Sequence, residues 1–184
     1  ECRHMVMFGR AIERSGARPY GLLWWERLIM TMLPFAMRGS LLWVAALVGE
    51  EIFDALQREM LDDPELQPLV SRLMRIHVTE ESRHIGFARD AVVRRRALRS
   101  RWETFVAANL HGLAALRFKY LFTNSAMYAR AGLDRQEATA AARSNPNFQQ
   151  MQIVGFSSLA AFLEENGLMT RFSRRLWRRA GFLE

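Results

Sequence analysis

Cysteine is almost absent from this sequence of 184 residues, and the single one, Cys2, cannot form an internal disulfide framework. A structural zinc site, which favours several thiolate ligands, is disfavoured for the same reason. A chain with so little cysteine is typical of a reducing compartment, so we expect a cytoplasmic location.

Long uninterrupted hydrophobic runs are also lacking. The longest are residues 41–49 and the stretch 28–37, which Pro34 interrupts and Arg38 ends. Neither approaches the roughly 18 to 20 apolar residues that cross a membrane, so we expect no membrane span. The chain starts in helix-like sequence at Glu1 and not at a methionine, and we expect the natural polypeptide to extend upstream.

Acidic residues are outnumbered by basic ones, 19 against 26, which gives a net charge of +7 and a pI near 10.8. All but one of the basic residues are arginine. This balance permits binding to nucleic acid or to an acidic surface, but charge alone indicates only salt-dependent association. No glycine-rich phosphate loop is present, and we expect no nucleic-acid partner.

Apolar residues make up half of the chain, which is enough to bury the core of a single domain over residues 1–184. They recur at helical spacing without strand-like alternation or a short repeat, which predicts an all-α fold. The second expected helix should be buried and stop at Pro34, and Ser40 should cap the third. The expected helices cover residues 1–15, 22–33, 39–62, 65–99, 102–126, 135–143, 148–165 and 170–180.

The stretch His-Val-Thr-Glu-Glu-Ser-Arg-His, residues 77–84, lies in the fourth expected helix. Residues three, four and seven positions apart share a helix face, so His77, Glu81 and His84 point the same way. Apolar residues, Ala88 among them, continue that face, which indicates that it looks inward. A metal ion would satisfy these buried polar groups, and so would a hydrogen-bonded network of core histidines.

Two other expected helices carry acidic residues of the same kind. Glu1 and His4 are three apart on the first, so they form a second Glu-x-x-His pair. Glu50 and Glu51 lie at the middle of the third, which is apolar nearly all round. One of these two carboxylates is a further candidate ligand, and the apolar pattern does not choose between them.

Ferritin-like di-iron carboxylate proteins carry Glu-x-x-His on two helices of a bundle and a single Glu on each of the other two. The order of the residues described above, with three histidines among them, resembles the p-aminobenzoate N-oxygenase family, the AurF-like non-haem di-iron oxygenases. The separation of Glu50 from His77 suits this family better than that of Glu51. The positions that the resemblance makes metal ligands are Glu1, His4, Glu50, His77, Glu81 and His84.

The resemblance implies a ferritin-like helical bundle with additional C-terminal helices, in which one more glutamate would come from a helix upstream of residue 1. It implies two iron ions as the cofactor, dioxygen as co-substrate and an external electron donor. The implied reaction is N-oxygenation of a small aromatic amine, through the hydroxylamine to the nitro compound, with no catalytic residue beyond the metal ligands. A homodimer is compatible with the resemblance.

Two alternatives stay open. Another di-iron hydroxylase or oxidase could share the bundle and most of the ligands. A non-enzymatic, basic helical interaction module could instead hold its histidines and glutamates in a hydrogen-bonded network. A zinc hydrolase is disfavoured because the order His-Glu-x-x-His is absent, and carboxylate with imidazole suits iron.

Three further expectations concern residues outside the ligand pattern. Asp54, in the third expected helix, is a candidate for orienting an imidazole. His111 has no carboxylate three or four positions away, so we do not expect it to be a ligand. The arginine-rich segment 171–179 should pack Phe172 and Trp177 against its own domain and not bind a membrane or nucleic acid.

Overall fold

A computed structural model describes residues 2–18, 21, 23–122 and 124–184, so the predicted ligand Glu1 lies outside the described residues. The described part is all-α, as predicted, and contains no strand. Its helices are α1 (Cys2–Arg14), α2 (Trp24–Ala36), α3 (Gly39–Leu61), α4 (Pro68–Arg94), α5 (Arg101–Phe122), α6 (Ser125–Arg130), α7 (Arg135–Ser144), α8 (Pro146–Glu165) and α9 (Arg171–Ala180), with a 3-10 turn, η1 (Arg96–Leu98), after α4.

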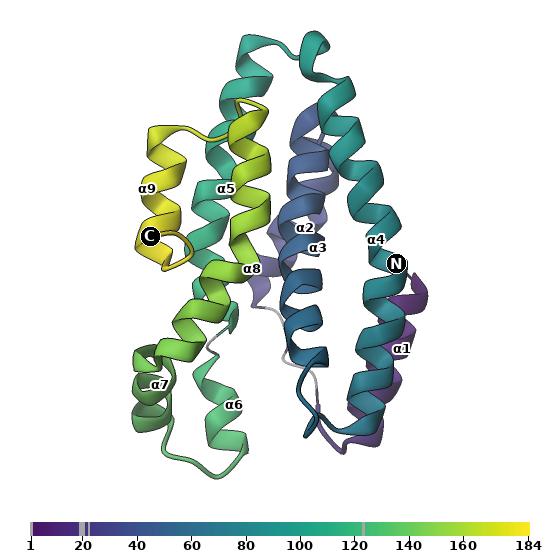
Figure 1. Cartoon of the computed structure of the whole chain (residues 1–184), viewed down its shortest axis with the longest axis vertical. Coiled ribbons are helices and arrows are strands. Elements are labelled where there is room, and N and C mark those ends of the chain that lie inside the picture. Colours follow the sequence, from purple (N-terminus) through teal and green to yellow (C-terminus); the bar gives the residue numbers. More distant parts are fainter. Residues whose placement is uncertain (1, 19–20, 22, 123) are drawn as a thin grey trace.

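Helices α3 and α4 form a long hairpin in which α3 is central to the bundle and α4 lies to one side, with α1 along it (Figure 1). Helices α5 and α8 pack against α3, and α9 packs on α5. The helix expected over residues 65–99 is shorter than predicted, because Gln67 caps it at Pro68 and it gives way to η1 after Arg94. None of the described helices is long and apolar enough to cross a membrane.

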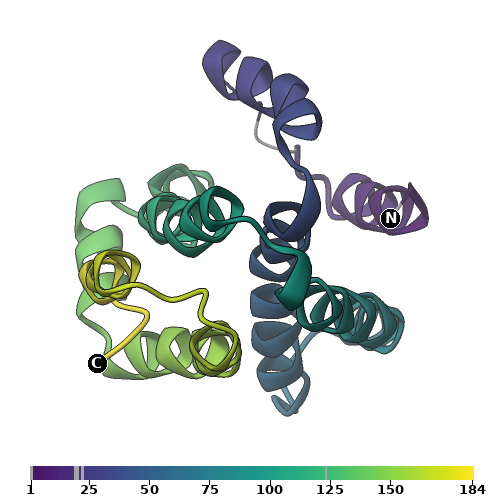
Figure 2. The same cartoon turned by 90° about the horizontal axis from the view of Figure 1, so that it is seen from above.

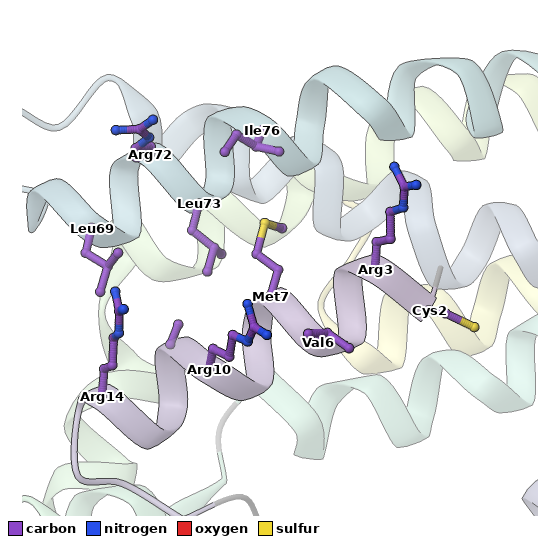
Figure 3. Close-up of a pocket in the computed structure, with 11 residues that line it drawn as sticks. Cys2, Arg3, Val6, Met7, Arg10, Arg14, Leu69, Arg72, Leu73 and Ile76 are labelled. Carbon is purple, nitrogen blue, oxygen red and sulfur yellow. The ribbon is translucent and has the colours of Figure 1, made fainter.

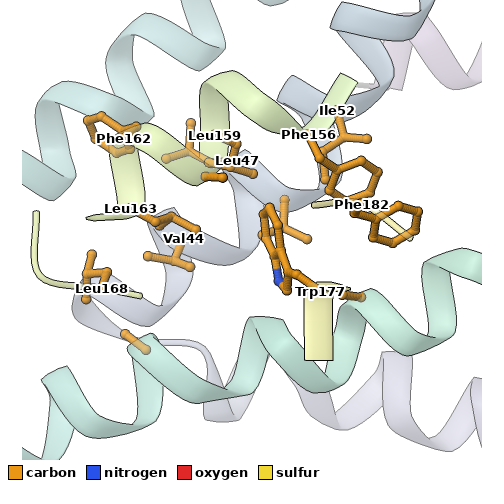
Figure 4. Packing of buried hydrophobic residues seen from close by; sticks show 14 of the residues in the cluster. Val44, Leu47, Ile52, Phe156, Leu159, Phe162, Leu163, Leu168, Trp177 and Phe182 are labelled. Atoms are coloured by element: carbon orange, nitrogen blue, oxygen red, sulfur yellow. The ribbon is translucent and has the colours of Figure 1, made fainter. Parts of the chain in front are cut away.

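The hydrophobic core lies among α3, α5, α8 and α9 (Figure 4). Phe156 of α8 stacks on Phe182 with ring centroids 3.7 Å apart, and Trp177 of α9 meets the Phe156 ring edge-on. Burying a side chain of this size stabilises the fold by roughly 1.5–3 kcal/mol. Other buried members of the cluster are Val44, Leu47, Ile52, Leu159 and Leu163.

The start of α3 is fixed by a residue from another helix. Ser40, expected to be the N-cap, is buried inside the first turn, and Arg38 takes the cap position without a side-chain hydrogen bond. The Ser40 backbone N–H donates instead to Glu103 Oε1 of α5 at 2.6 Å, and this bond lowers the pKa of the Glu103 carboxyl. Gly39 precedes it at φ +59°, where a Cβ would collide with the Glu103 carboxylate.

Helix α2 departs from the prediction of a buried helix ending at Pro34. It runs on to Ala36 and has no buried residue, and Figure 2 shows it standing away from the bundle. An ion pair between Glu26 and Arg117, whose guanidinium lies over the Trp25 ring, ties it to α5. Helical spacing predicted the helix correctly, but an apolar composition cannot say whether a partner covers it. Pro34 thus lies inside the last turn of α2 and does not end the helix.

Helix α9 confirms only half of the packing expected for the arginine-rich segment. Trp177 is fully buried, but Phe172 is 51% exposed. The inward face is formed by Ser173, Leu176, Trp177 and Ala180, and Phe172 lies off this face because successive residues turn by about 100°. The helix lies so close to α5 that a Cβ on Gly112 would be 2.8 Å from Ser173 Cα.

His111 is a core residue in the described structure. Its Nε2 donates to the Leu168 carbonyl at 2.9 Å, and its ring meets Trp177 edge-on. Burial lowers its pKa below the ordinary value of 6.5. His111 therefore binds a proton less well in the native protein than in the unfolded chain. Its contribution to stability is lost as the pH falls below about 6.5.

We predict that His111→Gln, which can donate to Leu168 but does not titrate, weakens the dependence of stability on pH. Between pH 7 and pH 5 the free energy of unfolding should fall more in the wild type than in the variant, as measured by urea denaturation. The variant differs from the wild type only at this side chain, so the difference isolates residue 111. If the free energy of unfolding fell equally with pH in both proteins, His111 would not be a source of the pH dependence.

Candidate metal centre

Three helices bring five of the six predicted ligands together. Helix α4 supplies His77, Glu81 and His84 from one face, α1 supplies His4, and α3 supplies Glu50. The His4 ring centroid lies 4.7 Å from that of His77 and 6.0 Å from that of His84. The helical spacing on α4 thus places its polar residues against α1 and α3, as expected from the sequence.

Glu81 lies at the centre of this cluster and is only 1% exposed. Its Oε1 is 2.9 Å from His4 Nδ1 and 3.4 Å from His77 Nε2, and its Oε2 is 3.2 Å from His84 Nδ1. The two carboxylate oxygens therefore face different imidazoles. An ionised carboxylate buried this deeply requires positive or hydrogen-bonding partners, because its desolvation is costly.

The ligand atoms fall into two groups that share Glu81. One group is His4, His77 and Glu81, and the other is Glu50, Glu81 and His84. Within each group the potential ligand atoms lie within 4.8 Å of one another. The mixture of carboxylate and imidazole suits iron and similar divalent ions, so the arrangement could hold two such ions with the Glu81 carboxylate between them.

Polar residues outside the predicted set hold two of the imidazoles. His77 Nδ1 donates to Gln57 Oε1 at 2.9 Å, and His4 Nε2 donates to Glu80 Oε2 at 2.6 Å. The bond to His4 lowers the pKa of the Glu80 carboxyl. Neutral imidazoles bound in this way turn the lone pair of the other ring nitrogen toward Glu81, which is the orientation that a metal needs.

These two partners were missed by the sequence reading. Gln57 is two helical turns beyond Glu50, so its spacing on α3 could have placed it on the same face. Glu80 is three positions after His77 and four before His84, so its spacing on α4 could also have placed it beside these histidines. Its contact with His4, 76 positions away on another helix, has no signal in the sequence.

The structure also distinguishes the two neighbouring glutamates of α3. Glu51 is buried and forms an ion pair with Arg89 of α4, and it accepts a hydrogen bond from Ser158 of α8. Glu50 is the one that joins Glu81 and His84. The two side chains point to different helices because adjacent residues on a helix are rotated by about 100°.

One family of known proteins matches most of the chain. The family described as P-aminobenzoate N-oxygenase AurF matches residues 1–167. The chain belongs to this family. The predicted fold class, an all-α ferritin-like helical bundle, is thereby confirmed, and the match extends beyond the ligand-bearing helices into α8.

The AurF-family chain is similar to uncharacterized mycobacterial proteins. One, from Mycobacterium tuberculosis, is 28% identical, and another, from Mycobacterium bovis, is 27% identical. Each alignment covers 97% of this chain and 54% of the relative, so the chain spans about half the length of the curated relatives it matches. No solved structure matches the chain.

Two hollows lie near the cluster. The larger, of about 600 Å³, runs between α1 and α4 and is bordered by arginines such as Arg10 and Arg72 (Figure 3). No member of the His/Glu cluster lines it. The smaller, of about 270 Å³, is lined by Glu50 and His84 together with Trp43, Ala46, Phe87 and Ala88. The smaller hollow is therefore the one that gives access to the cluster.

Asp54 does not orient an imidazole, which corrects the expectation drawn from its spacing. It accepts hydrogen bonds from Arg58 at 2.7 and 3.0 Å, and Arg58 also donates to the Val78 carbonyl and Ser82 Oγ of α4. Asp54 lies one helical turn beyond Glu50, and Arg58 lies one turn beyond Asp54. The Asp54 carboxylate therefore binds Arg58 and not an imidazole of the cluster. The acid therefore helps to hold α3 against α4.

We predict that Asp54→Asn lowers the free energy of unfolding by about 1 kcal/mol, because Arg58 loses a charged acceptor while remaining half exposed. Urea denaturation would measure the loss. Asp90→Asn is a matched control, since Asp90 pairs with Arg94 on the exposed face of α4 at 3.8 Å. The control should be nearly neutral, and an equal loss in both variants would argue against a structural role for Asp54.

Proposed function

We propose that this AurF-family protein is a non-haem di-iron oxygenase that N-oxygenates a small aromatic amine, through the hydroxylamine to the nitro compound. The observation that carries the proposal is the pair of His/Glu groups sharing the buried carboxylate of Glu81. The family match supports the same class of chemistry. The relatives are about twice as long, so the activity is proposed for the whole protein.

In this proposal His4, His77 and Glu81 would hold one iron ion, and Glu50, Glu81 and His84 would hold the other. The bound ions would supply the redox chemistry by which dioxygen is reduced, with electrons from an external donor. The negative charge of Glu81, which both groups share, would lower the repulsion between the two cations. Glu1, which lies outside the described residues, stays a predicted ligand.

The surrounding residues prepare the two positions differently. Gln57 and Glu80 hold the rings of His77 and His4, so these imidazoles keep one orientation and one tautomer. The side chain of His84 is 42% exposed and borders the smaller hollow. We therefore expect the substrate and dioxygen to approach from the side of His84.

The smaller hollow also favours an aromatic substrate. Trp43 and Phe87 form its walls and lie edge-to-face with ring centroids 5.3 Å apart. Ala46 and Ala88 leave room beside them. An aromatic ring could pack on these walls with its amino group directed toward Glu50 and His84. The electron donor, a homodimeric state and a cytoplasmic location remain predictions.

We predict that the protein binds about two iron ions per chain and that Glu81→Gln abolishes this binding, because a neutral amide cannot bridge two cations. Elemental analysis after anaerobic loading would measure it. Glu59→Gln, an exposed acid on the same helix as Glu50, is the control and should bind as the wild type does. Unchanged iron in Glu81→Gln would refute the bridging role, and an iron-free wild type would favour the interaction module.

We also predict that the iron-loaded protein, given oxygen and a reductant, converts p-aminobenzoate or a related arylamine to hydroxylamino and nitro products. Mass spectrometry of the products would identify them. A product hydroxylated on carbon would instead favour another di-iron hydroxylase of the same fold.

A further inference from the structure

Beside the predicted ligands lies a partly buried ion pair, of Arg89 with the buried Glu51, that no step above uses. Arg89 Nε donates to Glu51 Oε2 at 2.9 Å, and its Nη2 bonds both Glu51 Oε1 and, at 2.8 Å, Ser158 Oγ. Ser158 Oγ lies 3.1 Å from Glu51 Oε1 and donates to it. The guanidinium also lies over the Phe162 ring, 4.6 Å from its centroid. The three polar residues, which we call the clamp, thus join α3, α4 and α8 at one point.

The clamp is coupled by sequence position to the ligands of one metal position. Glu51 directly follows Glu50 on α3, and Arg89 is five residues beyond His84 on α4. Adjacent residues on a helix are rotated by about 100° about its axis, so Glu50 points in a different direction from Glu51, which faces α8. Fixing Glu51 therefore fixes the direction of Glu50, and fixing Arg89 fixes how far α4 is displaced along α3.

The chemistry of the clamp favours precise positioning. A guanidinium offers its donors in a planar fork that matches a carboxylate, so the pair allows little freedom in distance or angle. An ion pair with a buried carboxylate can contribute less net stability than an apolar contact of the same volume, because the buried charge, here that of Glu51, loses its hydration. The burial of the Glu51 carboxylate, which is 6% exposed, is thus better explained by a positioning role than by a contribution to stability.

The other metal position is held by different residues. His4 is oriented by Glu80 and His77 by Gln57, two residues that do not belong to the clamp. A loosened clamp should therefore disturb Glu50 and His84 while leaving His4 and His77 in place.

We propose that Glu51, Arg89 and Ser158 are positioning residues that set the distance from Glu50 to Glu81 and His84, and so are required for the second metal position but not for the first. This inference rests on the proposed function, since it presupposes that the two groups bind metal.

The test compares metal binding and spectra in the full-length protein, with Co²⁺ as the probe. The wild type should bind about two Co²⁺ per chain, and their magnetic coupling should be visible by electron paramagnetic resonance. Arg89→Met should bind about one, with the uncoupled signal of a single ion. Arg89→Lys keeps the charge but loses the fork, and should weaken the second site by about 10- to 100-fold.

Two further variants separate positioning from folding. Arg89→Met leaves the Glu51 charge unpaired, so the double variant Glu51→Gln/Arg89→Met removes both charges and should recover any stability that is lost. It should still bind one Co²⁺, because the fork is absent. Arg94→Met, which breaks the exposed pair with Asp90 on the same helix, should keep two coupled ions.

The outcomes are distinguishable. If both the wild type and the double variant bound two coupled Co²⁺ ions, the positioning role of the clamp would be overturned and the proposed function would stand. Loss of both ions from a folded double variant would also overturn it, because the effect would not be selective. A wild type without bound Co²⁺ would overturn the proposed function, and the clamp with it.

Discussion

The burial of one carboxylate, that of Glu81, is the constraint on which the rest of the centre depends. An ionised carboxylate in a protein interior costs several kcal/mol unless positive or donating groups surround it. Here three imidazole nitrogens lie 2.9 to 3.4 Å from its two oxygens, and a metal ion held by these groups would supply the positive charge. Glu81 and two of the histidines share a face of α4, but His4 must be delivered by another helix. The packing of α1 on α4 is therefore part of the site as well as of the fold.

The stability of the fold is supplied some distance from this polar cluster. The largest buried side chains, such as Trp177 and Phe156, lie between α3, α5, α8 and α9. Helix α3 belongs to both regions, since Ile52 packs in this core while Glu50 faces the cluster two positions earlier. A separate apolar core can hold α3 in place while the face toward α4 carries charged and polar groups whose net contribution to stability is small.

Arginine joins the two regions. Arg58 reaches from α3 to the backbone and Ser82 of α4, and Arg89 reaches from α4 to Glu51 of α3 and Ser158 of α8. The two contacts run in opposite directions across the same helix pair, so a shift of α4 along α3 would break both. Part of the arginine excess of this basic chain is thus used inside the fold.

The sequence by itself determined the helices and the local part of the site, because helical periodicity is a property of neighbouring residues. It placed His77, Glu81 and His84 on one face, and family resemblance added His4 and favoured Glu50. Only the tertiary structure decided what depends on residues far apart in the chain: that Glu51 turns to Arg89, 38 positions away, that Gln57 and Glu80 hold the imidazoles, and that Asp54 binds Arg58. The exposure of α2 and of Phe172 belongs with these, since an apolar helix face is buried only if another element reaches it.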